Sequence, residues 1–378
     1  MTAAGLGRVG PPLEVDVAVA GAGLPALAAA LELSRRRVRV ALIGTGPPRQ
    51  ARGLGLALLG PGRPYGRIAA ALGRDEARLV WAAGCENHLR LRDFLDSVGR
   101  DCGYAPRGSF LLALDRAEAA ELAESEDMLR DDGFPGEFLD HYMLETRFDL
   151  WGFPGAYWAA EDAEVDGQML LEALDDRVRA AGVALVRGPV RALEAEGGSV
   201  AVEAEDADVR AGAAIVATDG VACGIVPELR PLLRPAAPGR LRATVLDGAR
   251  LPSAVRTVNG RFAWRCSGGA MLLSATGTEH ERPEDQLLGF AQRVPLEVAS
   301  ALRWDETTEV TADRLPLVGP LPGRPLAVAC GFGALPLGLA FAASRWVADA
   351  LLGRSDPTPA ALRAARAPAP AGGGLASV

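Results

Sequence analysis

A glycine-rich turn near the N-terminus is the first place where residue types and spacing suggest chemistry. Residues 21–26 read GAGLPA and follow the apolar run VDVAVA. This matches the pattern G-x-G-x-x-G/A, in which Gly21 permits a tight turn, Gly23 admits a phosphate and Ala26 lets helix and strand pack closely. The amides and dipole at the helix start favour negative charge. The turn predicts a dinucleotide site, and a purely structural glycine turn is the alternative.

The next expected strand ends in glycine where a dinucleotide-binding unit normally has an acid. Residues 40–46 read VALIGTG, so Gly44 stands where Asp or Glu would hold the adenosine ribose. Arg49 or Arg52 nearby could instead accommodate a 2′-phosphate. This pattern leaves an NADP-linked dehydrogenase as a less favoured hypothesis.

Two later segments offer further ligand-binding turns. Residues 213–220 read AAIVATDG, an apolar run that ends in Ala217, Thr218 and Asp219. Residues 326–353 contain an apolar run, a glycine-rich turn from Gly331 and a helical stretch. That helix would present a second positive end to a ligand. A simple nicotinamide dehydrogenase does not need this second turn, so its presence argues against one.

Composition narrows the classes of protein. The chain has 378 residues and a net charge of −8, and it is 49% hydrophobic, which indicates a globular protein and argues against nucleic-acid binding. No apolar run reaches the roughly 18 residues of a membrane span, so we expect a cytoplasmic protein without a membrane partner. All 40 basic residues are arginine, which excludes mechanisms that need a lysine. Five cysteines without CxxC spacing and three histidines predict no metal site.

The hydrophobic periodicity predicts the elements that position these turns. Helices are expected at about 24–36, 74–98, 115–132, 168–181, 283–302 and 338–352. Strands are expected at 15–20, 38–43, 183–187, 189–194, 199–204, 213–217 and 326–330, with antiparallel sheet over 239–275. Nucleotide-type units at both ends, with antiparallel sheet between them, predict an α/β fold (α+β overall) made of two interleaved domains.

The order and spacing of several segments resemble a known family, the D-amino-acid-oxidase-like flavoenzymes, which include glycine oxidase, sarcosine oxidase and gamma-glutamylputrescine oxidoreductase. The resemblance covers nearly the whole ordered chain. Besides GAGLPA, it rests on residues 104–122, 155–174, 213–220, 303–322 and the turn that begins at Gly331. ADRLPLVG (312–319) and FAWRCSGGAMLL (262–273) are most similar to the putrescine-type enzymes.

The resemblance implies FAD bound in an extended form by a discontinuous Rossmann-like domain. We expect this domain to comprise 15–90, 151–230 and 306–354, and a substrate domain on a mostly antiparallel sheet to comprise 91–150 and 231–305. Residues 1–14 and 355–378 are expected to be flexible termini. The implied cofactor-binding residues are Gly21, Gly23, Leu24, Ala26, Arg52, Gly53, Val190, Ala217, Thr218, Asp219, Gly331, Phe332, Gly333, Ala334, Leu335, Pro336 and Leu337.

The chain also departs from the family pattern. Arg52 and Gly55 stand where relatives usually have Ser and Asn near the flavin. Leu335 and Pro336 replace the His-Gly common in the C-terminal turn. Thr308 falls near the position of an arginine that binds the substrate carboxylate in amino-acid oxidases, which speaks against simple glycine-type recognition.

The sequence identifies no catalytic residue but suggests three candidates. Arg265, on a central strand, would face either the flavin or solvent, and the alternation does not decide between them. Some sarcosine-oxidase-like relatives place a lysine over the flavin, where its charge assists the reaction with oxygen. This chain has no lysine, so Arg265 or Arg52, in the glycine-rich segment, would have to take that part. Trp304 would pack near the site or stack on substrate. Cys330, before the C-terminal turn, is expected to be a buried core thiol.

These observations predict an FAD-dependent oxidoreductase that oxidises a C–N bond of an amine or amino-acid-like metabolite by hydride transfer to flavin. Such chemistry needs a dry pocket and little acid–base assistance. The alternative is a flavin-fold protein that has lost catalysis and serves as a scaffold or partner. The sequence leaves open the amine, the electron acceptor and the oligomeric state.

Overall fold

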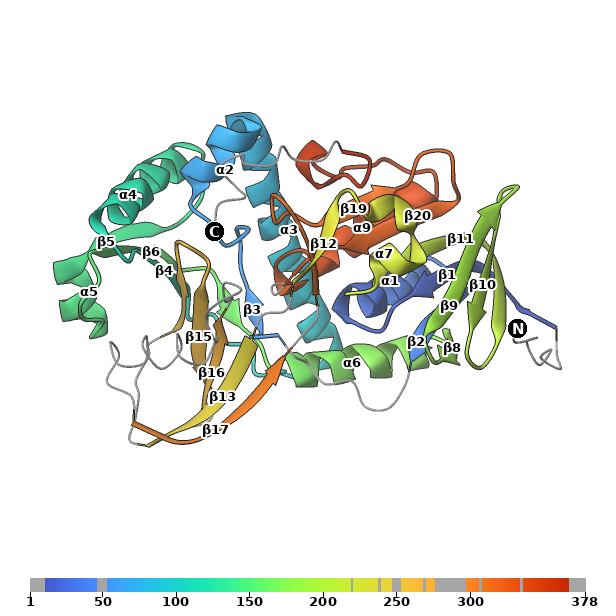
Figure 1. The fold of residues 1–378 in the computed structure, drawn as a ribbon, viewed down its shortest axis with the longest axis horizontal. Helices are drawn as coiled ribbons and strands as arrows, with labels where there is room; N and C mark the ends of the chain where they lie inside the picture. The colour runs from blue at the N-terminus through green and yellow to red at the C-terminus, as the bar shows by residue number, and fades with distance from the viewer. Residues whose placement is uncertain are drawn as a thin grey trace, which may run out of the picture.

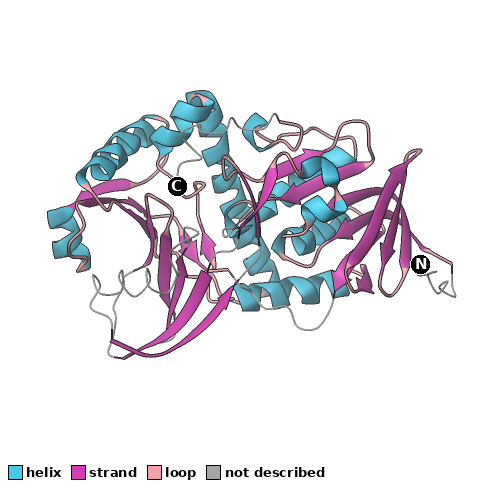
Figure 2. Ribbon diagram, in the orientation of Figure 1, coloured by secondary structure: helices cyan, strands magenta, loops and turns pink. Residues whose placement is uncertain are grey.

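The computed structural model describes residues 11–45, 53–218, 220–236, 239–246, 253–267, 270–275, 297–305, 308–333 and 336–366. Two eight-stranded sheets, each covered by helices, organise this part of the chain (Figures 1 and 2). Each sheet takes strands from separate parts of the sequence. The mixed α/β class predicted from the sequence is confirmed.

The first sheet is built around parallel strands. Its order is β19-β20-β11-β1-β2-β8. The parallel members are β1 (Leu13–Ala20), β2 (Val40–Thr45), β8 (Ala184–Arg187), β11 (Asp208–Val216) and β20 (Leu326–Cys330). The antiparallel members are β19 (Leu317–Pro320), β9 (Val190–Glu196) and β10 (Ser199–Ala204). The central strands are buried, which accounts for their uninterrupted apolar runs.

Four helices share one hydrophobic core with the first sheet. They are α1 (Leu24–Arg35), α3 (Arg74–Val98), α6 (Gly167–Ala180) and α9 (Ala340–Leu351). Trp346 of α9 is 1% exposed within this core. Helix α3 has Asp75 and Glu76 in its first turn, where the helix dipole favours acids, and it ends at Gly99 in the left-handed conformation.

The second sheet is mostly antiparallel. Its order is β17 (Glu297–Asp305), β13 (Gly239–Leu246), β16 (Ala270–Ala275), β15 (Phe262–Ser267), β14 (Ala254–Thr257), β4 (Ser109–Leu112), β6 (Gly155–Ala159) and β5 (Glu137–Asp140). Only the β14–β4 pairing is parallel among the described strands of this sheet. Around it lie α2 (Tyr65–Leu72), α4 (Arg116–Asp131) and α5 (His141–Phe148) (Figure 1).

Short elements connect the two regions. Strand β3 (Leu56–Ala57) pairs with β7 (Ala163–Glu164), and β12 (Leu233–Ala236) pairs with β18 (Thr308–Thr311). The remaining described elements are α7 (Ala222–Ile225) and the 3-10 turns η1 (Pro227–Leu229), η2 (Pro336–Gly338) and η3 (Ala360–Leu362). No described helix is both long and apolar enough to cross a membrane.

Three sequence-based expectations differ from the structure. The expected helix at 283–302 is wrong for 297–302, which belong to strand β17, and 283–296 lie outside the described residues. Strand β6 lies in the second sheet, although 151–230 were assigned to the FAD-binding domain, because it pairs with β4 and β5. Residues 355–366 were expected to be flexible, but Leu362 is fully buried in the core of α1, α3 and α9. The other domain boundaries stay predictions.

Residues 53–63 form a strap that is held closely on both sides. A Cβ atom added to Gly84 of α3 would lie 1.6 Å from the Leu59 carbonyl oxygen, and one added to Gly60 would lie 2.3 Å from the Trp81 ring. On the other side, the Leu59 amide donates a 2.8 Å hydrogen bond to Asp162. Glycine at these two positions therefore allows the strap to lie directly on α3.

We expect Gly84→Ala to destabilise the protein by about 1–3 kcal/mol or more, because the added methyl must displace backbone rather than a flexible side chain. Gly224→Ala in α7 is the control, because a Cβ there meets nothing within 4 Å. Urea unfolding of both variants measures the difference. Equal stability of the two variants would show that the strap can move away from α3 without loss.

Candidate active site

The carboxyl ends of three parallel strands meet at the glycine-rich turn after β1. Gly21 has φ 141°, and a Cβ there would lie 2.2 Å from the Ala217 carbonyl oxygen. The Gly21 amide donates to Ile43 of β2 at 2.8 Å, and the Ala217 amide donates to Ala20 at 2.8 Å. Only glycine fits this position, so the turn is fixed by contacts on both sides.

The first turn of α1 points its positive end at this junction. Gly23 is the N-cap, and no side chain caps the helix. The first backbone acceptor is the Gly23 carbonyl, which receives the Leu27 amide at 3.1 Å. Leu24 and Ala26 are buried, and Ala26 packs with the sheet as the motif predicts. A helix start without a capping side chain favours a bound anion.

Thr218 supplies a polar group beside this turn. It follows Ala217 at the end of β11, it is 9% exposed, and its Oγ1 atom is buried without a hydrogen-bond partner. An unsatisfied buried hydroxyl is unfavourable unless a ligand completes it. The glycine turn, the uncapped helix and this hydroxyl together fit a dinucleotide cofactor such as FAD. Asp219, also predicted to bind it, lies outside the described residues.

Gly44 explains why this strand carries no ribose-binding acid. It has φ 111°, and a Cβ there would lie 3.3 Å from the Gly21 carbonyl carbon and oxygen. A glutamate would therefore be strained, so the glycine also serves the packing of β2 against the turn. Val190, predicted to meet the adenine, is half-buried at the start of β9. It packs against the hydrophobic cluster that contains Ala18 of β1 and Val200 of β10. Its cofactor role stays a prediction.

The second glycine-rich turn follows β20. Gly331 and Gly333 have φ 74° and 61°, Phe332 is 8% exposed between them, and Leu337 is 5% exposed. Ala334 and Leu335 lie outside the described residues, and the backbone of Pro336 begins η2. Cys330 is fully buried in β20, as expected of a core thiol.

Asn87 closes part of the second helix start, which sequence reasoning did not identify. Its Oδ1 accepts from the amides of Phe341 at 2.9 Å and Ala342 at 3.2 Å, and its Nδ2 donates to Leu337 at 2.6 Å. Two amides of α9 are thus bound within the protein. The helix dipole remains, but the start of α9 is less open to a ligand than the sequence suggested. The signal that could have indicated it is an asparagine within the helix expected at 74–98.

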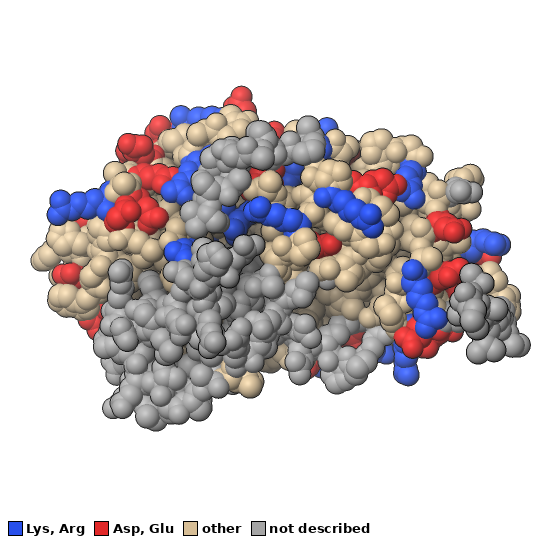
Figure 3. All heavy atoms as spheres, in the orientation of Figure 1, with Lys and Arg blue, Asp and Glu red and all other residues tan. Residues whose placement is uncertain are grey.

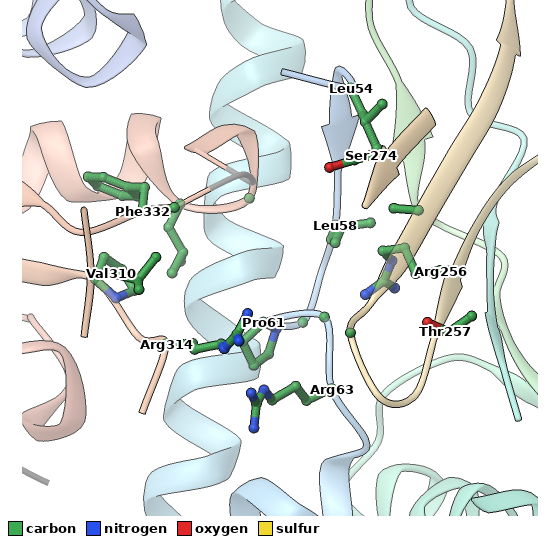
Figure 4. Close-up of a pocket in the computed structure, with 18 of the residues that line it drawn as sticks. Leu54, Leu58, Pro61, Arg63, Arg256, Thr257, Ser274, Val310, Arg314 and Phe332 are labelled. Atoms are coloured by element: carbon green, nitrogen blue, oxygen red, sulfur yellow. The ribbon is translucent and has the colours of Figure 1, made fainter. Parts of the chain in front are cut away.

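A cavity of about 160 Å³ lies between the second turn, the strap and the second sheet (Figure 4). Leu54, Leu58, Phe332 and Leu339 supply much of its apolar wall. The described lining also contains four arginines and no Asp, Glu or His; the arginines are Arg63, Arg256, Arg261 and Arg314. None of the four was singled out from the sequence, because they come from three distant segments.

Burial and mutual repulsion shape the electrostatics of this wall. Burial lowers the pKa of Arg63 to about 10, and the positive charges of Arg314 and Arg67 act in the same direction. Burial also lowers the pKa of Arg314 and of Arg256. The three groups nevertheless remain cations near neutral pH. The wall therefore combines apolar side chains with buried positive charge.

Arg265 faces inward but does not line this cavity. It is 5% exposed, and its Nη1 atom lies 3.4 Å from Oε2 of buried Glu164. A Cβ on Gly55 would lie 3.2 Å from its Nη2. This settles the face of the strand that the sequence left open, and it shows that Glu164 offsets part of the positive charge.

The remaining residues singled out from the sequence either lie outside the described residues or do not line the cavity. Arg52 lies outside the described residues, as does the side chain of Trp304, whose backbone belongs to edge strand β17. Gly53, a predicted cofactor residue, is half-buried at the start of the strap. Thr308 is 2% exposed and donates to the Ala236 carbonyl at 3.2 Å, so its hydroxyl is engaged in β12–β18 and does not line the cavity.

Comparison with known proteins places this arrangement in context. The family model described as FAD dependent oxidoreductase matches residues 16–350. Glycine oxidase from Geobacillus kaustophilus is 21% identical, with a TM-score of 0.75 over 91% of this chain and 96% of that one. L-amino acid deaminase from Proteus vulgaris, with a specific insertion deleted, is 17% identical, with a TM-score of 0.73 over 95% and 96%. Iminodiacetate oxidase from Chelativorans sp. BNC1 is 19% identical, with a TM-score of 0.72 over 91% and 97%. A search of curated protein sequences finds no match.

We expect Thr218→Val to weaken FAD binding about 2- to 13-fold, because one neutral hydrogen bond contributes about 0.5–1.5 kcal/mol. The cofactor-free protein should keep its stability, because the valine removes an unsatisfied hydroxyl. Titration of the apoprotein with FAD measures the first effect and thermal unfolding the second. Thr358→Val is the control, because its Oγ1 is also buried without a partner but lies far along the chain from the turn. Unchanged FAD affinity in Thr218→Val would remove this hydroxyl from the site.

We expect Arg265→Met to destabilise the fold by about 3–5 kcal/mol, because Glu164 would be left as a buried, uncompensated charge. Adding Glu164→Gln should restore much of that loss. Arg100→Met, which breaks an exposed ion pair with Asp176, should change stability by less than about 1 kcal/mol. Urea unfolding of the set decides the question, and a fully stable Arg265→Met protein would contradict a structural role for the pair.

Proposed function

Because the chain belongs to the family of FAD-dependent oxidoreductases, we propose that it oxidises a C–N bond of an amine or amino-acid-like compound. The observation that carries this proposal is the arginine-lined cavity, which lies beside the second glycine-rich turn and is enclosed on one side by the strap. A small anionic amine fits such a wall better than a neutral or cationic compound does.

The residues present fit FAD. Gly21, Gly23 and the start of α1 would hold its pyrophosphate, and Thr218 would complete a hydrogen bond to it. The turn Gly331–Leu337 would border its redox-active ring at the cavity. Bound FAD would supply the two-electron acceptor that C–N oxidation requires. The assignment of a cofactor domain and a substrate domain stays a prediction.

The side chains of the cavity would bind and orient the substrate. Leu54, Leu58 and Phe332 would exclude water, and the arginines would hold the negatively charged part of the molecule. Because the described lining has no carboxylate or imidazole, it offers no general base from these residue types. The substrate nitrogen would therefore have to enter as the neutral amine.

The similar solved structures support this reaction class. Glycine oxidase, L-amino acid deaminase and iminodiacetate oxidase are all named for action on amino compounds. Each aligns with this chain over at least 90% of both chains. At 17–21% identity these likenesses show a shared fold, while the substrate of this protein must be sought from its own residues.

We expect the purified protein to carry a flavin that absorbs near about 450 nm and is bleached by an amine in the absence of oxygen. An alcohol with the same carbon skeleton should leave the flavin oxidised, because the proposed chemistry acts on the C–N bond. Anaerobic spectra against matched amine and alcohol pairs measure both effects. Flavin that no amine reduces would contradict the proposal and favour the scaffold alternative.

A further inference from the structure

The described end of the chain returns to the wall of the cavity. Residues 358–366 pass beside β19, where the Ala364 amide donates to the Val318 carbonyl at 2.9 Å. The Ala361 amide donates at 2.7 Å to Oε1 of Glu76, in the first turn of α3. Residues 358–366 therefore connect the start of α3 with β19.

Arg366, at the end of this segment, binds the turn between β18 and β19. Its Nη1 atom donates to the Pro316 carbonyl at 2.7 Å, and its Nη2 atom donates to the Leu315 carbonyl at 2.8 Å. Nη2 also donates to Oδ1 of Asp313 at 2.8 Å. The side chain of Arg366 is only 11% exposed. Because a guanidinium presents its donors in a rigid, planar fork, these bonds fix residues 313–316 against the C-terminal segment.

The turn that Arg366 holds is part of the cavity wall. Arg314 and Pro316 line the cavity, as does Val310 of the preceding strand. Val310 also forms an isolated antiparallel bridge with Phe332 of the second glycine-rich turn. Figure 4 shows Val310, Arg314 and Phe332 on one side of the cavity. A shift of residues 313–316 would therefore displace the wall beside the turn proposed to border the flavin ring.

We propose that Arg366 is a positioning residue for the substrate, because it fixes the turn 313–316 and so holds Arg314 and Pro316 in the cavity wall. Arg366 is not among the described residues that line the cavity, so it acts through the turn. Its removal would take a donor from Asp313 and from two backbone carbonyls, and buried groups that lose a hydrogen bond favour rearrangement. The inference rests on the proposed function, since it assigns a residue that supports binding at that same cavity.

Two substitutions and a matched control separate positioning from stability. Arg366→Met removes the fork but keeps an apolar chain in the same space. Arg366→Lys keeps the charge, but a compact ammonium cannot reproduce the fork, so its effects should be in the same direction and smaller. Arg36→Met is the control. Arg36 is 12% exposed and binds Glu32 at 2.7 Å and Asp349 at 2.8 Å, and none of these three residues lines the cavity.

The first measurement is hydrogen exchange in the holoprotein. The Arg314 amide donates to the Thr311 carbonyl at 3.1 Å, and the Leu315 amide donates to Asp313 at 3.0 Å, so both report on the turn. Arg366→Met should speed their exchange tenfold or more, and Arg366→Lys threefold or more. Arg36→Met should lower the temperature of unfolding without changing exchange in this turn.

The second measurement is anaerobic bleaching of the flavin by glycine, sarcosine and iminodiacetate. For an amine that bleaches the parent protein, Arg366→Met should raise the half-saturating concentration tenfold or more and change the limiting rate less than threefold. Arg366→Lys should raise the half-saturating concentration less than Arg366→Met does. Arg36→Met should leave both quantities unchanged, because it weakens the fold at a distance from the wall.

Three results would overturn the inference: unchanged exchange of the turn in both Arg366 variants, faster exchange without a change in the half-saturating concentration, or an equal rise of that concentration in Arg36→Met. Failure of the proposed function gives a different pattern. Bleaching that is unaffected by both Arg366 variants would uphold the reaction and reject the inference. Faster exchange in those variants, without bleaching of the parent protein by any amine, would reject the reaction and uphold the hold of Arg366 on the turn.

Discussion

The close contact between the strap and α3 is the constraint on which the site depends. Gly84 lets the Leu59 carbonyl approach the helix backbone, Gly60 leaves room for the Trp81 ring, and Asp162 holds the Leu59 amide from the other side. The strap in turn carries Leu54, Leu58 and Arg63 into the cavity wall. Because backbone is fixed against backbone, these side chains are positioned more precisely than a free loop would allow.

The wall of the cavity contains buried arginines, which are electrostatically unfavourable for stability. Arg256 is buried beside Asp162, whose pKa is raised by burial. Arg63 lies near Arg314 and Arg67. Burial of arginine charge is unfavourable and neighbouring cations repel one another, so this arrangement lowers stability. Departures of this kind are expected where a protein binds a ligand. By contrast, Arg265 has Glu164 beside it and is separated from the cavity, so it belongs to the support of the site.

Both ends of the proposed cofactor site use helix starts, but in different ways. The start of α1 has no capping side chain, so its amides are available to a phosphate. The start of α9 is capped by Asn87, which also ties the second turn to α3 through Leu337. The first helix is therefore suited to binding charge directly, and the second to holding the turn that borders the cavity.

Acidic and basic side chains are interspersed over the described part of the face in Figure 3, so the concentrated positive charge is a feature of the cavity rather than of that surface.

Local patterns in the sequence determined the first sheet and its turn. Apolar runs predicted β1, β2, β11 and β20, and GAGLPA predicted the turn after β1, because these features depend on residues close together in the chain. Strand β17 was missed because its sequence also suits a helix and only pairing with β13 decides its conformation. Likewise, Arg63, Arg256 and Arg314 are separated by long stretches and have no common motif. Only the tertiary structure brings them to one cavity, because the strap, the second sheet and the turn after β18 converge through contacts that local periodicity does not encode.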